Sequence, residues 1–151
     1  MHPFTNAADR TLVLGGVSFP GFKALAGHSD SDVIAHAITD AILGAAGLGD
    51  IGGFFPDTDP DFDGADSVAL LSTAAQAVRD AGWDVVNVDC TVVLDNPKIA
   101  PVREEMRRNL SDALFRAPVL IKGKRTEGIG ALGRGEGIAC WAVTLLSRTP
   151  E

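Results

Sequence analysis

The stretch "GHSDSDVIAHAITD" (residues 27–40) carries two of the three histidines of the chain. His28, Asp32, His36 and Asp40 recur every four residues, and residues at this spacing share one face of an α-helix. Imidazole and carboxylate groups on one face could hold a divalent metal ion. They could equally form a solvated helix face with a capping residue, and the spacing alone leaves both interpretations open.

The loop after this stretch, "GDIGGFFPDTDPDFDGAD" (residues 49–66), contains six aspartates, and we expect it to expose Phe54 and Phe55. Long loops of such composition more often carry function than merely connect elements. A neutral imidazole at His36 suits zinc, and a second histidine and a carboxylate would complete three protein ligands. The fourth position would then stay open for a phosphate oxygen of a substrate.

The overall charge constrains what this chain can bind. With 151 residues, 46% of them hydrophobic and 22% charged, it has the length and composition of one globular domain. Its net charge of −7 argues against a nucleic-acid partner, which would need clustered cations. An acidic protein that binds a phosphate must use a local basic pocket, backbone N–H groups or metal ions.

The sequence predicts neither a membrane protein nor a secreted one. No apolar run reaches the roughly 18 residues of a membrane span, and the N-terminus "MHPFTNAADR" lacks the apolar segment of a signal peptide. Cys90 and Cys140 lie in apolar, strand-like segments without a close-spaced motif. We therefore expect reduced core cysteines in a cytoplasmic protein.

The elements that must position these residues follow from hydrophobic periodicity and turn residues. "TLVLGGVSF" (residues 11–19) predicts a hairpin around its Gly-Gly pair. A helix is expected over residues 32–46, capped by Ser29 or Asp30 and ended by Gly47. Its apolar side, at helical spacing, consists of Val33, Ala37, Ile38, Ala41, Ile42 and Ala45.

The rest of the chain alternates between helices and strands. A second helix is expected over residues 67–81, and a strand over residues 85–95 that ends before Pro97. A third helix, over residues 101–115, opens with a proline and acidic residues, and two strands follow near residues 119–122 and 137–146. This order predicts an α+β fold, in which three helices cover one face of a mixed β-sheet.

A glycine-rich segment near the C-terminus is the second candidate for chemistry. "GIGALG" (residues 128–133) agrees with the dinucleotide pattern G-x-G-x-x-G, but a strand follows it instead of a helix, so we reject a dinucleotide site. Glu127 and Arg134 lie among glycines that let a backbone approach a ligand, and Lys98, Lys124 and Arg125 supply cations. A flexible hairpin with a solvated salt bridge remains the alternative.

Together these motifs resemble the 2-C-methyl-D-erythritol 2,4-cyclodiphosphate synthase family, zinc enzymes of non-mevalonate isoprenoid synthesis. The segments that carry the resemblance are "HSDSDVIAHAITDAILGAAGLGDIG", "FFPDTDP", "NPKI" and "TEGIGALGRGEGIAC". With weaker similarity between them, they cover residues 12–146. The resemblance implies a homotrimer with three active sites, each between neighbouring subunits.

The resemblance also implies a reaction. The substrate would be 4-diphosphocytidyl-2-C-methyl-D-erythritol 2-phosphate, a small molecule, and the products 2-C-methyl-D-erythritol 2,4-cyclodiphosphate and CMP. The terminal phosphate attacks the β-phosphorus of the diphosphate, closes the ring and expels CMP. Catalysis of such phosphoryl transfer consists mostly of positioning and charge neutralisation.

The roles of individual residues are implied in the same way. His2 and His36 would hold Zn²⁺ or another divalent transition metal, Glu127 would hold Mg²⁺ or Mn²⁺, and His28 and Ser29 would contact the attacking phosphate. The methylerythritol-binding wall would consist of Asp50, Ile51, Gly52, Phe55, Pro56, Asp57, Thr58 and Asp59. The nucleotide pocket, whose backbone groups bind the cytosine, would consist of Leu94, Asp95, Asn96, Pro97, Lys98, Ile99 and Ala100, with Lys124 and Thr126 beside it. Arg134 would lie near the central cavity of the trimer as a substrate contact, and Asp40 would support the metal site or an interface.

The sequence departs from the family pattern in two places. The family carries Asp-x-His after a first β-strand, whereas Met1 falls on the middle residue here, so we expect this aspartate ligand and strand to be missing. A valine codon misread as an internal start would explain this difference. Lys124 and Arg125 stand where the family has small residues and threonines, and we expect Arg125 to neutralise the reacting phosphate as a catalytic residue.

Two other functions compete with this one. The first is a trimeric, catalytically impaired relative that binds a nucleotide or an isoprenoid phosphate without turning it over. The second is a zinc hydrolase on an unrelated fold, against which the absence of an HExxH helix argues. About one tightly held zinc per subunit would favour the cyclase over the impaired relative.

Overall fold

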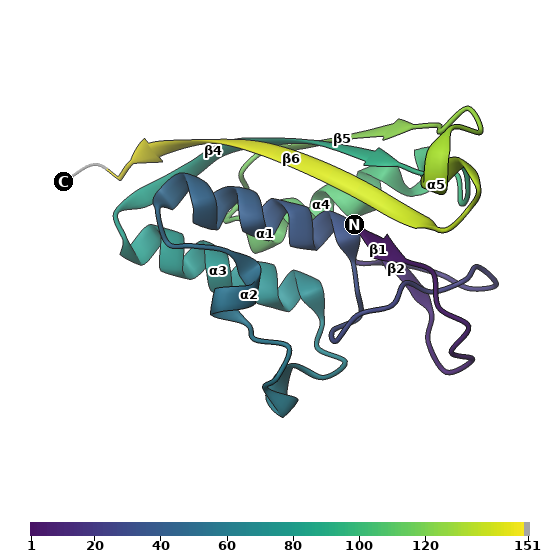
Figure 1. Cartoon of the computed structure of the whole chain (residues 1–151). Helices are drawn as coiled ribbons and strands as arrows, with labels where there is room; N and C mark the ends of the chain where they lie inside the picture. Colours follow the sequence, from purple (N-terminus) through teal and green to yellow (C-terminus); the bar gives the residue numbers. More distant parts are fainter. Residues whose placement is uncertain (150–151) are drawn as a thin grey trace.

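A four-stranded mixed sheet forms one layer of the molecule in a computed structural model, which describes residues 1–149 (Figure 1). Its strand order is β1-β6-β4-β5. The strands are β1 (His2–Pro3), β4 (Trp83–Val93), β5 (Val119–Lys124) and β6 (Gly137–Arg148). β5 runs parallel to β4, whereas β6 is antiparallel to both β4 and β1. The short strand β1 thus occupies the edge of the sheet beside β6.

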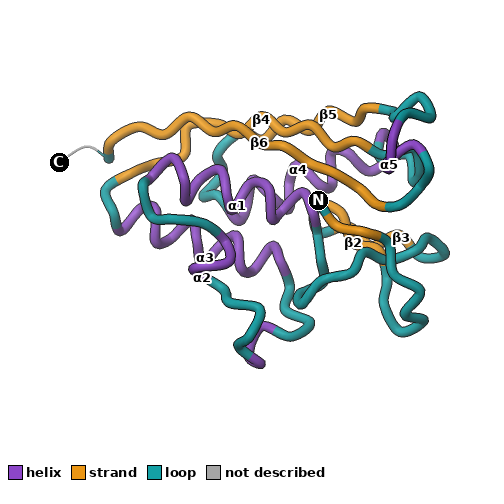
Figure 2. Tube along the Cα trace, in the orientation of Figure 1, coloured by secondary structure: helices purple, strands orange, loops and turns teal. Residues whose placement is uncertain are grey.

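Three helices cover one face of this sheet, as expected for the predicted α+β domain (Figure 2). They are α1 (Val33–Ala46), α3 (Ser67–Asp80) and α4 (Arg103–Ala113). The connections contain α2 (Ile51–Phe54), α5 (Gly130–Gly133) and the 3₁₀ turns η1 (Pro60–Phe62) and η2 (Ala100–Val102). Within the described residues no helix is both long and apolar enough to cross a membrane.

The predicted hairpin forms as β2 (Leu12–Leu14) and β3 (Val17–Phe19). Gly15 and Gly16 turn the chain with φ values of 58° and 70°, which glycine adopts without steric cost. The backbone N–H of Gly16 then donates to Asp32 Oδ2 at 2.7 Å. The hairpin therefore ties the start of α1 to the N-terminal part of the chain.

Helix α1 corrects two details of the sequence prediction. Its cap is Asp32 instead of Ser29 or Asp30, because Asp32 Oδ1 accepts hydrogen bonds from the N–H groups of Ile34 and Ala35. Ile34 and Leu43 are fully buried, whereas Ala45 is exposed. α1 packs against both β6 and α3, so its buried surface is wider than a single apolar stripe and includes residues outside the predicted one.

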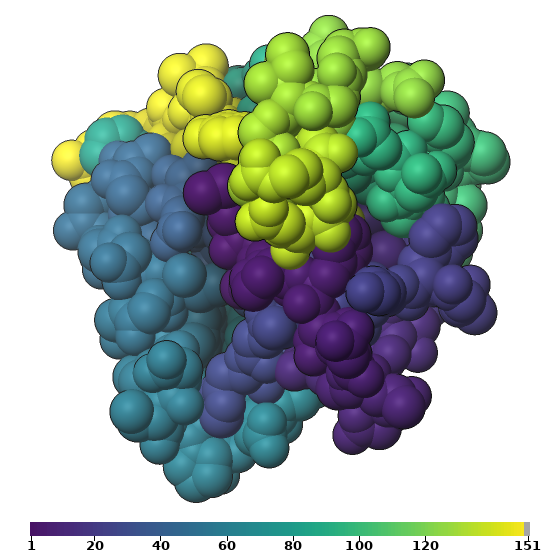
Figure 3. All heavy atoms as spheres, turned by 45° about the vertical axis from the view of Figure 1, so that its right-hand side comes forward, coloured from purple at the N-terminus to yellow at the C-terminus, as the bar shows by residue number. Residues whose placement is uncertain are grey.

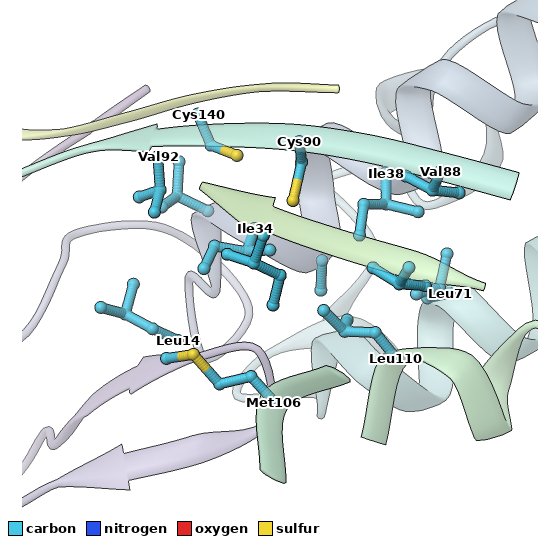
Figure 4. Close-up of a cluster of buried hydrophobic side chains, with 14 of the residues drawn as sticks. Leu14, Ile34, Ile38, Leu71, Val88, Cys90, Val92, Met106, Leu110 and Cys140 are labelled. Atoms are coloured by element: carbon cyan, nitrogen blue, oxygen red, sulfur yellow. The ribbon is translucent and has the colours of Figure 1, made fainter. Parts of the chain in front are cut away.

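The third helix begins later than expected, since Ala100–Val102 form a 3₁₀ turn and α4 starts at Arg103. Side chains from the sheet and all three helices meet in one core (Figure 4). Cys90 and Cys140 belong to it, both buried and free, as predicted. The neighbouring Cys90 side chain and burial both raise the pKa of the Cys140 thiol, which keeps this thiol protonated.

Candidate functional site

Most residues of the first predicted site line one cavity of about 360 Å³. We call it the histidine cavity. Figure 3 shows the N-terminal segment (purple) beside the blue segment that contains α2, and the cavity lies between them. Its lining residues are His2, Gly27, His28, Ser29, His36, Ile51, Gly52, Phe55, Asp57, Phe62 and Leu70. Residues far apart in sequence, from β1, the loop before α1, α1, α2 and α3, therefore share one concave surface.

The two predicted zinc ligands face each other in this cavity. His2 Nε2 lies 2.9 Å from His36 Nδ1. The other ring nitrogen of His2, Nδ1, lies 3.0 Å from the carbonyl oxygen of Ala26, and a carbonyl can only accept. Nδ1 therefore carries the proton, and Nε2 of His2 presents a lone pair.

Two hydroxyl groups lie beside the outer ring nitrogen of His36, Nε2. The Ser67 hydroxyl donates to Asp30 Oδ1 and lies 2.8 Å from His36 Nε2. His36 Nε2 also lies 3.0 Å from the Ser29 hydroxyl oxygen. When His36 Nε2–H donates to Ser67 or Ser29, His36 Nδ1 presents a lone pair toward His2, and a metal ion between the two nitrogens would relieve their repulsion. When the Ser29 hydroxyl donates to Nε2, His36 Nδ1–H donates to His2 Nε2 instead.

Burial keeps both imidazoles of the pair uncharged. Burial lowers the pKa of His36 to about 4. Burial and the nearby N-terminal amino group also lower the pKa of His2. Both imidazoles are therefore neutral at pH 7, the form in which histidine binds zinc.

The separation of the histidine pair is shorter than zinc binding requires. Two imidazole nitrogens bound tetrahedrally to one zinc at 2.0–2.1 Å lie about 3.3 Å apart, against the 2.9 Å observed here, so the rings would move apart by about 0.4 Å to hold the ion. The carbonyl and hydroxyl partners of the outer nitrogens are those that commonly orient metal-bound histidines. The residues present thus supply two oriented ligands. Among residues 1–149, however, no third histidine, cysteine, aspartate or glutamate joins them in a metal-binding group.

Arg10 holds the loop that carries His28 and Ser29. Its guanidinium donates to the carbonyl oxygen of Gly27 at 2.6 Å and to that of Ser29. His28 Nε2 in turn lies 2.9 Å from the carbonyl oxygen of Asp59. No local sequence pattern predicts this role of Arg10, because nothing near it in sequence connects it with a loop nearly twenty residues away. The pattern likewise predicts only a cap at Asp30 and a helix start at Ser67.

The predicted methylerythritol wall forms one side of the histidine cavity. Asp40 Oδ1 accepts a hydrogen bond from Ile51 N at 2.9 Å and so anchors the start of α2. Asp50 caps this helix through Gly53 N at 2.8 Å. Ile51, Gly52, Phe55 and Asp57 line the cavity, whereas Asp50, Pro56, Thr58 and Asp59 belong to the same segment without lining it.

The expected exposure of Phe54 and Phe55 is wrong. Both side chains are partly buried against the core, and Phe55 packs edge-to-face on Phe62 with ring centroids 5.3 Å apart. Aromatic packing therefore gives this aspartate-rich loop a hydrophobic base, which the sequence pattern alone did not reveal.

A second cavity, of about 150 Å³, lies where the parallel strands β4 and β5 end. We call it the basic cavity. Its lining residues are Leu94, Asp95, Pro97, Lys98, Ile99, Ala100, Arg103, Gly123, Lys124 and Arg125. It unites most of the predicted nucleotide-binding residues with Arg125. Asn96 lines instead a neighbouring hollow that Arg134 also borders.

Asp95 organises the rim of the basic cavity. Its carboxylate accepts hydrogen bonds from the hydroxyl and the backbone N–H of Thr126, which hold the pKa of Asp95 below its usual value. Arg125 Nε lies 3.7 Å from Asp95 Oδ1, and Lys98 Nζ donates to the backbone oxygen of Asp95 at 3.0 Å. The loop after β4 and the segment after β5 are therefore joined by one side chain.

The remaining predicted residues lie apart from the histidine pair. Glu127 is exposed in a left-handed conformation (φ 52°) and lines neither cavity. Arg134 forms an exposed ion pair with Glu136 at 2.7 Å. Within one chain the structure thus separates the predicted site into a histidine part and a basic part.

Comparisons with known proteins identify the family of the chain. The YgbB family model matches residues 1–147. A 2-C-methyl-D-erythritol 2,4-cyclodiphosphate synthase of Laribacter hongkongensis is 57% identical, over 94% of this chain and 90% of the relative. One of Rubrobacter xylanophilus is 53% identical, over 98% and 91%.

Solved structures give the same result. The chain superposes on the bifunctional IspDF of Campylobacter jejuni with a TM-score of 0.88 and 41% identity, covering 97% of this chain and 40% of that one. A CDP complex of IspF from Plasmodium falciparum gives a TM-score of 0.83 and 34% identity, over 99% of this chain and 92% of that one. The chain therefore belongs to the YgbB family, the 2-C-methyl-D-erythritol 2,4-cyclodiphosphate synthases.

Proposed function

We propose that this enzyme assembles each reaction centre from the histidine cavity of one subunit and the basic cavity of a neighbour. As a member of its family it is a lyase of non-mevalonate isoprenoid synthesis that forms 2-C-methyl-D-erythritol 2,4-cyclodiphosphate. The substrate carries a phosphate at one end and a cytidine diphosphate at the other. Two separate cavities, one rich in histidine and one rich in cations, suit those two ends.

The uncovered face of the sheet supports a homotrimer. β6 exposes Trp141, Val143 and Leu145 by 57%, 73% and 58%, and β5 exposes Leu120 by 50%. These side chains lie opposite the helices, so nothing in the described chain covers them. On the same face Asp89 of β4 lies between Leu120 and Val143 and pairs with Lys122. An uncovered sheet face with several exposed apolar side chains around one ion pair suits a protein–protein interface. Copies of the chain packed through this face would bring the histidine cavity of one subunit beside the basic cavity of another. A chain that acts as a monomer would keep these two cavities apart.

His2 and His36 are the residues that would hold Zn²⁺ or another divalent transition metal, and Glu127 would hold Mg²⁺ or Mn²⁺. Bound divalent ions would polarise phosphate oxygens and neutralise their charge, which resolves how a protein of net charge −7 accepts a polyanion.

The side chains of this chain would then position the reacting groups. His28 and Ser29 would orient the attacking phosphate, and the segment from Asp50 to Asp59 would hold the methylerythritol. The loop from Leu94 to Ala100, with Lys124 and Thr126, would bind the cytidine.

An oxygen of the terminal phosphate attacks the β-phosphorus, the bond between that phosphorus and the oxygen bridging to the α-phosphate breaks, and CMP leaves with that bridging oxygen. Arg125 would neutralise the charge that develops on the phosphates, while Arg134 would contact substrate near the trimer axis.

The observation that carries this assignment is the close approach of His2 Nε2 and His36 Nδ1, which lie 2.9 Å apart inside the cavity. Phosphorus NMR with zinc, magnesium and the diphosphocytidyl substrate tests it. We expect the signals of CMP and the cyclic diphosphate to appear, with about one zinc retained per subunit. A chain that binds the nucleotide but releases no CMP, with or without an added N-terminal aspartate, would favour the catalytically impaired relative.

A cytoplasmic location is part of the same proposal. Cys90 and Cys140 are free and buried in the core, and a reducing compartment keeps such thiols unmodified. Fractionation of cells that produce the full-length enzyme would test the location directly.

A further inference from the structure

Arg10, in the connection between β1 and β2, directs its guanidinium at backbone oxygens instead of at a carboxylate. It donates to the carbonyl oxygen of Gly27 at 2.6 Å and also to that of Ser29. None of the ion pairs among residues 1–149 includes it, although the protein carries a net charge of −7. Arg10 does not line the histidine cavity. Any effect of Arg10 on that cavity must therefore pass through the loop that it holds.

Two segments of the chain hold this loop by its backbone. The carbonyl groups of Gly27 and Ser29 accept hydrogen bonds from Arg10. The carbonyl group between them, that of His28, accepts one from the backbone N–H of Gly64 at 2.8 Å. Three consecutive carbonyl groups are thus bound alternately by Arg10 and Gly64. Loss of Arg10 would release one of the two attachments of the loop.

Ser31 closes the loop in a conformation that serine normally avoids. Its φ is 62°, in the left-handed region, where the Cβ of a residue other than glycine crowds the backbone. The side chain is fully buried, and its Oγ lies 3.4 Å from a guanidinium nitrogen of Arg10 and 3.4 Å from the Ser29 carbonyl oxygen. A Cβ added to Gly27 would lie only 2.5 Å from Ser31 Oγ, so the loop is also closed tightly. Such a strained backbone persists only where surrounding contacts hold it, and Arg10 contacts both Ser29 and Ser31.

The left-handed conformation of Ser31 directs its backbone N–H toward the Ser29 hydroxyl. This N–H donates to Ser29 Oγ at 3.2 Å, and the same oxygen lies 3.0 Å from His36 Nε2. Ser29 lines the histidine cavity, although only 6% of its surface is exposed. Because the N–H of Ser31 occupies one lone pair of the oxygen, it restricts the directions in which the hydroxyl can point. The contacts that orient the Ser29 hydroxyl therefore lead back to Arg10.

We propose that Arg10 is a positioning residue, which holds the loop of residues 27–31 in its strained form and thereby orients the Ser29 hydroxyl toward the attacking phosphate. This rests on the proposed function, which assigns His28 and Ser29 to that phosphate. Charge-assisted hydrogen bonds are stronger than neutral ones, so one guanidinium can hold a strained loop. A hydroxyl that is oriented before the substrate arrives loses less freedom when the phosphate binds. Misplacement of a reacting group by about 1 Å can lower a rate by about a hundredfold.

The test is a double-mutant cycle in the full-length enzyme, measured by steady-state kinetics with zinc, magnesium and the diphosphocytidyl substrate. It consists of the wild type, Arg10→Met, Ser31→Gly and the double variant. Methionine keeps an unbranched side chain without its donors, and glycine adopts a φ of 62° without steric cost. Arg107→Met is the matched control, because Arg107 also donates to a backbone carbonyl oxygen, that of Val119 at 2.8 Å, and lines neither the histidine cavity nor the basic cavity.

We expect Arg10→Met to lower kcat about thirtyfold in the wild-type background but about fivefold or less in the Ser31→Gly background, because glycine keeps the loop conformation without Arg10. KM and zinc content should change little, since the basic cavity and the histidine pair stay intact, and Arg107→Met should keep the wild-type kcat. Equal losses of kcat in both backgrounds would overturn the role of Arg10, as would a loss of zinc that parallels the loss of rate.

Arg10→Lys keeps the positive charge but not the paired donors, so it should give an intermediate kcat. A wild-type kcat in this variant would show that charge alone is enough and would overturn the role of the paired hydrogen bonds. A wild type without turnover would refute the proposed function and this role together. An active wild type whose kcat is unchanged in Arg10→Met would refute this role alone.

Discussion

The two cavities of this enzyme are built on different physical principles. In the histidine cavity, partly buried hydrogen bonds orient each imidazole before any ligand arrives: His2 donates to the Ala26 carbonyl oxygen, and His36 lies beside Ser67, which donates to Asp30. In the basic cavity, most of the cations are exposed side chains gathered around one carboxylate, that of Asp95. A metal ligand requires a defined position and a defined protonation state, which burial provides. A phosphate requires positive charge over a range of positions, which flexible exposed side chains provide.

This contrast predicts that single substitutions cost more in the histidine cavity than in the basic cavity. The largest effect is expected for His36→Ala, which removes one of two oriented ligands. We expect tightly bound zinc to be lost and turnover to fall by about a thousandfold or more, with the oligomer intact. Metal analysis by mass spectrometry alongside activity measures this. His28→Gln should retain zinc, because His28 touches the Asp59 backbone and not the histidine pair, so loss of zinc there would contradict the division of roles.

The pH dependence of stability tests how strongly burial affects Asp32, the residue that caps α1. Burial raises the pKa of Asp32 to about 6, from 3.8 in the unfolded chain. The folded state therefore favours the protonated form, and the resulting stabilisation is complete below pH 3.8 and lost as the pH rises to about 6. It amounts to about 3 kcal/mol in the free energy of unfolding.

Urea unfolding between pH 4 and 7 checks this expectation. Asp32→Asn cannot titrate, so its stability should fall less steeply with pH than that of the wild type, while exposed Asp40→Asn should follow the wild type. Parallel slopes for wild type and Asp32→Asn would mean that the hydrogen bonds from Gly16, Ile34 and Ala35 keep Asp32 ionised.

Ser67→Ala tests the support of the metal site, because it removes a hydrogen-bond partner of His36 and keeps His36 itself. Without the hydroxyl, His36 Nε2 loses its partner on Ser67 and the ring is less firmly oriented. We expect zinc affinity to fall by about 10- to 100-fold, which competition with a chelator measures. Ser72→Ala, on the exposed side of the same helix, is the control. Equal affinity in both variants would show that the Asp30–Ser67–His36 chain does not support the metal site.

The smallest effect is expected in the basic cavity, for Arg125→Thr. Arg125 is 67% exposed and 3.7 Å from Asp95, so neighbouring cations can partly replace its charge. We expect kcat to fall by about tenfold with little change in zinc content. Steady-state kinetics with the diphosphocytidyl substrate measure this. Arg116→Thr serves as control, because Arg116 is exposed, pairs with Asp112 and does not line the basic cavity. A faster Arg125→Thr enzyme would mean that the arginine obstructs the nucleotide.

The sequence by itself determined the larger elements and the chemistry of the two sites. Periodicity and turn residues placed the hairpin, the three helices and the long strands to within a few residues, because local geometry repeats along the chain. The motifs around His28, His36, Lys98 and Glu127 indicated a cyclodiphosphate synthase, and the family comparison confirmed that identification.

Only the tertiary structure decided which residues support the site and how its parts are distributed. Arg10 and Ser67 contact the site from distant segments, and no local pattern records a contact that the fold creates. The same holds for Asp32, whose burial depends on the hairpin packed over it, and for Ser31, whose left-handed conformation is visible only once the loop lies against Arg10. Residue types reveal which chemistry is available, whereas burial and hydrogen bonds between distant segments arise from packing and reveal where that chemistry acts.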